Sequence, residues 1–151
     1  MALEYDFYAA ADITREEFLT FLAQTMSAPI SHDYVRGDGL QATAHRETPE
    51  EEASAVNEFG FPERISATFR FANLASEQLT DQNTVLMIRT VLAFFDRYPG
   101  SGVLLFNGER VVLQKLDGDV ELDSDWEDFS LDGMAEVIAG LSQRPLPQPF
   151  L

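Results

Sequence analysis

The stretch Arg64-Ile65-Ser66-Ala67-Thr68-Phe69-Arg70-Phe71 alternates apolar and polar side chains over most of its length. In a β-strand, successive side chains point to opposite faces of the sheet. The apolar residues from Ile65 to Phe71 therefore share one face, and Ser66, Thr68 and Arg70 share the other. The pattern predicts a strand in a sheet that is covered by other elements on one side.

Two segments on either side of this strand have apolar residues at helical spacing. Thr14-Arg15-Glu16-Glu17 is typical of a capping box, in which Thr14 and Glu17 bond each other's backbone amides, so we expect a helix to begin at Thr14. Pro29 ends it. A second helix is predicted over residues 80–98, with apolar side chains every three or four positions until Pro99-Gly100.

The remaining segments favour strands and turns. Residues 3–8 alternate like a strand, residues 32–45 indicate a hairpin, and residues 103–122 predict a meander of three strands with a turn at Asn107-Gly108. Residues 131–141 are expected to form a short last helix, followed by an extended Pro-rich tail over residues 144–151.

This order predicts one α+β domain spanning residues 1–151. Its antiparallel sheet would carry two main helices packed on one face, in a split βαβ-like arrangement with an extra C-terminal hairpin. With 151 residues, 45% of them hydrophobic, the chain is long enough to build one core without metals or crosslinks.

The charge of the chain limits its partners. Ten Lys and Arg residues stand against 26 Asp and Glu residues, which gives a net charge of −16. Proteins that grip nucleic-acid phosphates carry a basic surface, so no nucleic acid is predicted as a direct ligand. Such a charge attracts basic proteins instead. The alternative is that the chain, like many proteins, is acidic without any bearing on a partner.

The chain has no Cys, which fits a reducing compartment. It also shows neither an export signal nor an apolar stretch of about 20 residues, the length that a membrane span needs. We therefore expect a cytoplasmic protein without contact with a membrane.

No catalytic motif is recognisable in the sequence. Nucleophile elbows, phosphate-binding loops and dinucleotide fingerprints are missing. The two histidines, His32 and His45, have Asp33 and Glu47 nearby, so a metal cluster is conceivable, but surface histidines are commoner. The sequence therefore predicts a non-enzyme with no catalytic residue, no metal site and no cofactor.

The acidic residues are concentrated in two segments, 117–128 and 47–63, neither of which contains Lys or Arg. In the first, the alternating acids are expected to project from one face of a strand, with Trp126 as an aromatic anchor of an interface. The alternative is a solvated face with Trp126 in the core. The predicted partner-binding residues are Asp117, Asp119, Glu121, Asp123, Asp125, Trp126, Glu127, Asp128, Glu50, Glu51 and Glu52.

Three parts of the chain carry a resemblance to a known family: Ala2-Leu3-Glu4-Tyr5-Asp6, the segment from Gly60-Phe61-Pro62 to Phe71, and the segment from Val103 to Asp117-Gly118. With these features the chain resembles the swarming-inhibition type of bacterial immunity protein, encoded beside polymorphic toxins. The resemblance implies a non-enzymatic inhibitor of a cognate toxin. Together with the charge, it favours a basic, nuclease-like toxin. The alternative is a small-ligand-binding or regulatory α+β domain with no toxin partner, in which aromatic residues line a pocket.

Overall fold

A computed structural model describes residues 3–51, 60–116 and 118–148 of the chain. Its elements follow the order strand, helix, four strands, helix, three strands and a short C-terminal part. They are β1 (Glu4–Ala9), α1 (Arg15–Met26), β2 (Ile30–Ser31), β3 (Tyr34–Arg36), β4 (Leu40–Arg46), β5 (Ile65–Phe71), α3 (Glu77–Arg97), β6 (Gly102–Phe106), β7 (Arg110–Lys115), β8 (Val120–Asp123), the 3₁₀ helix η1 (Glu127–Ser130), α4 (Met134–Val137) and β9 (Ser142–Arg144).

The strands form one sheet in the order β2-β3-β4-β5-β1-β6-β7-β8-β9. The first strand of the chain, β1, lies in the middle and pairs antiparallel with both β5 and β6. Only the pair of β8 and β9 is parallel among the described strands. The α+β class and the antiparallel sheet predicted from the sequence are therefore confirmed, and so is the strand over residues 65–71.

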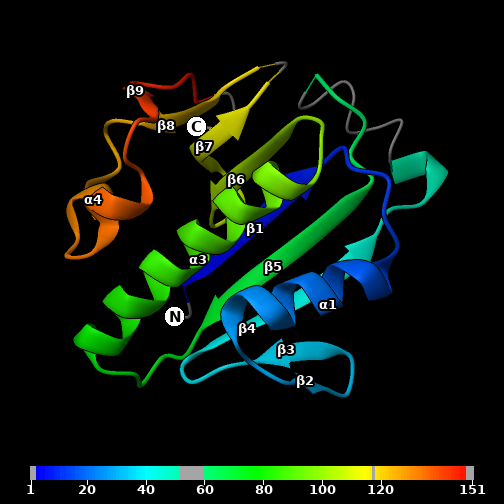
Figure 1. Ribbon diagram of the computed structural model, residues 1–151, viewed down its shortest axis with the longest axis horizontal. Helices are drawn as coiled ribbons and strands as arrows, with labels where there is room; N and C mark the ends of the chain where they lie inside the picture. The colour runs from blue at the N-terminus through cyan, green and yellow to red at the C-terminus, as the bar shows by residue number, and fades with distance from the viewer. Residues whose placement is uncertain (1–2, 52–59, 117, 149–151) are drawn as a thin grey trace.

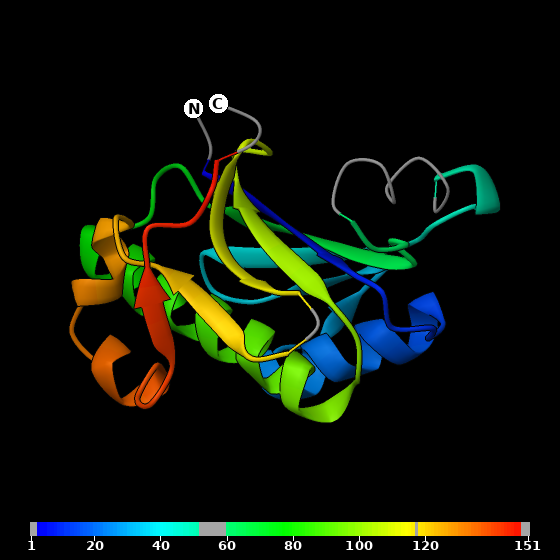
Figure 2. The same cartoon turned by 90° about the horizontal axis from the view of Figure 1, so that it is seen from above.

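Both long helices lie on the same face of the sheet, as Figures 1 and 2 show. At the start of α1, the Thr14 hydroxyl accepts a hydrogen bond from the Glu17 amide (3.1 Å), as the capping box predicts. The helix α3 begins three residues earlier than expected because Ser76 caps it and accepts from the Leu79 amide (3.1 Å).

Aromatic rings fill the space between the helices and the sheet. Phe7 of β1 packs against Phe94 of α3 with ring centroids 5.1 Å apart, and Phe18 of α1 lies 5.2 Å from the same ring. All three side chains are less than 3% exposed. Since apolar burial is the main force in folding, this cluster fixes the two helices on the sheet.

A smaller apolar cluster lies on the opposite face of the sheet. It consists of Phe61, Val103, Leu105, Val111 and Leu146. β6 is therefore buried on both faces, which explains its unbroken apolar run. Leu146 belongs to the segment that the sequence presents as an extended tail, so residues 145–148 pack against the body of the protein.

The C-terminal part differs most from expectation. The predicted helix over residues 131–141 is only four residues long, from Met134 to Val137. Gly133 precedes it and Gly140 follows it with positive φ angles of 85° and 79°, a conformation that interrupts a helix and that glycine adopts most readily. After it, β9 runs parallel to β8, so β8 is not the edge of the sheet.

Candidate partner-binding surface

Asp123 does not project into solvent as the strand pattern predicted. Only 1% of the residue is exposed, at the C-terminal end of β8. The alternation rule assumes that one face of a strand is open, whereas the segment that carries Leu146 and Gln148 covers Asp123. The prediction of an exposed contact residue at this position is therefore wrong.

The Asp123 carboxylate instead joins three parts of the chain. Its Oδ2 atom accepts a hydrogen bond from Arg110 Nη2 (3.1 Å) on β7 and one from Gln148 Nε2 (3.4 Å). Its Oδ1 atom accepts bonds from the amides of Asp125 and Leu146, both at 3.3 Å. Buried charges persist when they are paired and hydrogen-bonded, so Asp123 holds the C-terminal segment on the sheet.

Trp126 also lies in the interior, with 7% exposure. Its ring meets Phe129 edge to face at a centroid distance of 4.6 Å and Tyr5 at 6.0 Å. The structure agrees with the alternative in which Trp126 is part of the core. Trp126 therefore does not form an exposed aromatic anchor.

The other predicted acids have different surroundings. Asp119, Asp125 and Glu127 are exposed, and Asp128 is half-buried. Glu121 is half-buried and paired with Arg144 of β9 (2.6 Å), a contact that lowers the pKa of Glu121. Glu50 and Glu51 are exposed in a helical turn at residues 49–51, remote in sequence from the others, and Asp117 and Glu52 lie outside the described residues.

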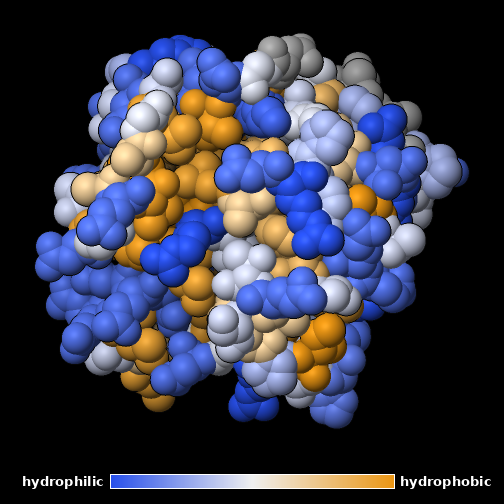
Figure 3. Space-filling view, viewed as in Figure 1, coloured by the Kyte–Doolittle hydropathy of each residue, from blue (hydrophilic) through white to orange (hydrophobic). Residues whose placement is uncertain are grey.

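Acidic side chains converge at the N-terminal end of α3. A hollow of about 770 Å³ lies there between α3 and the η1–α4 segment. Three acids line it, Glu77 and Asp81 from α3 and Asp132 from the loop before α4, and its described lining residues include no Lys or Arg. Figure 3 shows hydrophilic side chains gathered over this part of the molecule. We call it the acidic hollow.

Asp128 lies close enough to Asp81 of the acidic hollow to feel its charge. Burial raises the pKa of its carboxyl group, and the charges of Asp81 and Glu127 raise it further. Asp128 and Asp81 therefore belong to one negative surface, although they lie far apart in sequence. Sequence inspection missed Glu77 and Asp81 because isolated acids one helical turn apart look like an ordinary solvated helix face.

Asp81→Asn is expected to lower the pKa of Asp128 toward its ordinary value, because one of the two neighbouring charges is removed. A carboxyl pKa that is raised by folding costs stability at neutral pH, and that cost disappears as the pH falls through the pKa. The titration of the Asp128 carboxyl carbon by NMR measures the shift. Glu136→Gln, an exposed acid on α4, is the control; an equal shift in both variants would contradict the contact.

A family model described as SitI3-like matches residues 3–132. The chain belongs to the SitI3-like family. SitI proteins are a swarming-inhibition immunity family, so the resemblance inferred from the sequence is confirmed. The matched range runs from β1 through η1 and includes Glu77, Asp81 and Asp132 of the acidic hollow. No curated protein and no solved structure matches the chain.

A second hollow of this SitI3-like chain lies at the other end of α3. It measures about 400 Å³ and is lined by Asp96, Asp119 and Lys115 together with apolar residues that include Val120 and Leu141. Figure 3 shows an apolar band on this side of the molecule. The base Lys115 makes this hollow less negative than the acidic hollow.

The core aromatic residues Phe18, Phe21 and Phe94 of the SitI3-like chain pack on one another. All three are at most 5% exposed.

Over the described residues, no helix has both the length and the apolar character required to traverse a lipid bilayer.

Proposed function

We propose that this chain is an immunity protein that binds and neutralises a cognate bacterial toxin through the acidic hollow and the exposed acids beside it. The observation that carries the proposal is the SitI3-like match over residues 3–132. An immunity protein acts by occupying its toxin, so binding alone accounts for the activity and no catalytic group is needed.

The charge of the chain supports a basic toxin. A net charge of −16 attracts a positively charged surface over a distance, and complementary charges speed the association of two proteins. The acidic hollow adds a concave site, and the charge of Asp81 in it adds to burial in raising the pKa of the nearby Asp128. A basic side chain that enters the hollow would relieve this repulsion.

These features favour a toxin with a nuclease-like cleft. Such a cleft is basic because it holds phosphate groups. The carboxylates of Glu77, Asp81 and Asp132, with Asp128 near Asp81, would present negative charge in place of those phosphates. The chain would then neutralise the toxin by covering the cleft and excluding its substrate. The exposed acids Asp125 and Glu127 would extend the contact.

Co-expression with the toxin encoded beside this chain tests the proposal. We expect the chain to restore growth of cells that produce the toxin and to co-purify with it in a stable complex. A toxin that kills equally with and without the chain, and that does not co-purify, would overturn the proposal. Assays of the toxin on DNA and RNA, with and without the chain, then decide whether its activity is that of a nuclease.

A further inference from the structure

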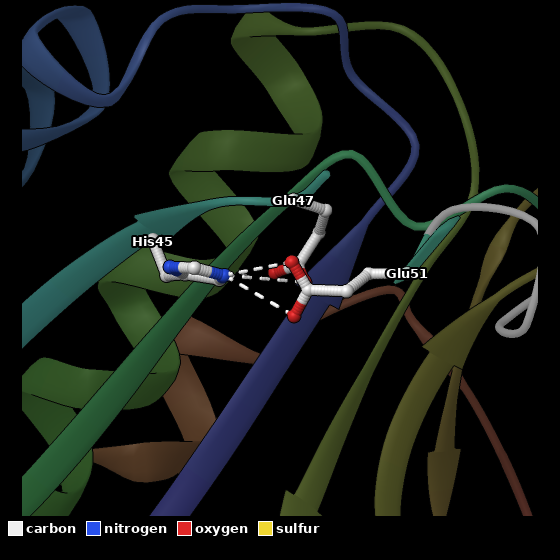
Figure 4. Close-up of side chains that lie close together, drawn as sticks. All are labelled: His45, Glu47 and Glu51. Carbon is white, nitrogen blue, oxygen red and sulfur yellow. Dashed lines mark hydrogen bonds and ion pairs between the residues drawn. The ribbon is translucent and has the colours of Figure 1, made fainter. Parts of the chain in front are cut away.

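His45, Glu47 and Glu51 bring three metal-ligating groups together at the end of β4, away from the sequence segments that supply the acidic hollow. His45 lies on β4, and Glu47 follows two residues later, so their side chains point to the same face of the sheet. Glu51 comes from the helical turn at residues 49–51. Figure 4 shows both carboxylates turned toward the imidazole ring.

The distances in this cluster match those between the ligands of one small ion. His45 Nε2 lies 3.2 Å from Glu51 Oε1 and 3.5 Å from Glu47 Oε2, and one ligand atom from each residue lies within 4.8 Å of the others. Zinc binds nitrogen and carboxylate oxygen at about 2.0–2.2 Å in a tetrahedron, so its ligand atoms lie roughly 3.4 Å apart. Little movement is needed to admit the ion.

Both carboxylates are held in place by neighbours. Glu47 is buried, with 4% of its side chain exposed, and accepts a hydrogen bond from Ser66 Oγ (2.8 Å) on β5. Glu51 accepts one from the Thr48 amide (2.8 Å), while the Thr48 hydroxyl accepts from the Glu51 amide (3.2 Å). This capping box fixes Glu51 beside His45. Such supporting hydrogen bonds are typical of metal sites, where they orient the ligands.

The charges around Glu47 also favour a cation. Glu63 is also buried, with 7% exposure, and its side chain is a hydrogen-bond partner of Glu47. A positive charge beside Glu47 would offset the cost of burying its carboxylate. His45 by itself supplies that positive charge only when it is protonated.

We propose that His45, Glu47 and Glu51 form a binding site for one divalent transition-metal ion, of which Zn²⁺ fits best. An imidazole with two carboxylates suits zinc, whereas calcium and magnesium take oxygen ligands. Three protein ligands leave a fourth position for water. The ion would fix the turn at residues 48–51 to the ends of β4 and β5. This role is independent of the proposed function.

Calorimetric titration of the untagged, metal-free chain with ZnCl₂ tests the site. We expect one ion to bind per chain. His45→Ala should weaken that binding at least tenfold. The matched control is His32→Ala, which removes the other histidine, an exposed residue of the turn between β2 and β3. Ser66→Ala, which removes the support of Glu47, should weaken binding about 10- to 100-fold.

A measurement on the unmodified chain covers the case in which a variant fails to fold. In ¹⁵N NMR spectra, zinc should shift the Nε2 resonance of His45 and leave both ring nitrogens of His32 unchanged. The proposal is overturned if the chain binds no zinc, if His45→Ala binds it as well as His32→Ala does, or if the two histidines respond alike. In those cases the cluster is only a network of hydrogen bonds around a protonatable histidine.

Discussion

Asp123→Asn is expected to lower the free energy of unfolding by about 2–3 kcal/mol. The change removes the charge that Arg110 faces across 3.1 Å, and the Arg110 side chain is only one-third exposed. Breaking a buried ion pair by removing one partner costs about 3–5 kcal/mol. We expect a smaller cost than this range because water still reaches part of the Arg110 side chain. An Asn side chain also offers one oxygen where the carboxylate accepts bonds with two.

Urea denaturation of Asp123→Asn and of Asp125→Asn measures the effect against a matched control. Asp125 is exposed, two residues away and subject to the same substitution, so its free energy of unfolding should change by less than about 0.5 kcal/mol. Equal midpoints for the two variants would show that Asp123 has no special role. A loss of toxin binding in an Asp123 variant would therefore reflect a destabilised C-terminal segment rather than a lost contact with the toxin.

Local patterns were sufficient to predict most of the fold. The alternation in residues 65–71 identified β5 and its buried face, and Thr14 with its capping box located the start of α1. Both signals act over a few residues, and the structure contains nothing that overrides them. α3 shows the limit, because its cap at Ser76 lacks the Glu or Gln that completes a capping box three residues later.

The burial of Asp123 could not be predicted from the residues next to it in sequence. Alternation groups Asp123 with Glu121 and Asp125, yet β8 becomes more buried toward its end. The groups that make burial of Asp123 possible come from Arg110 and from residues 146–148. Residues 146–148 reach Asp123 because the C-terminal segment folds back onto the sheet. The acidic hollow is likewise a product of the fold, since α3 and η1 supply its charges from separate parts of the chain.

Asp81→Lys combined with Asp132→Lys is expected to slow association with the toxin at least tenfold at low salt and to flatten the dependence of the on-rate on salt. Both acids line the acidic hollow, so the variant places two positive charges where a basic surface would dock. Asp38→Lys combined with Glu109→Lys gives the same net charge from exposed turns elsewhere and should change the on-rate less than threefold. Stopped-flow or biosensor kinetics over a salt series distinguish the two variants.

If both slow association equally, the overall charge attracts the toxin and the hollow does not. If neither does, the contact surface lies on another face, and the face of the sheet opposite α1 and α3 is the next to be tested.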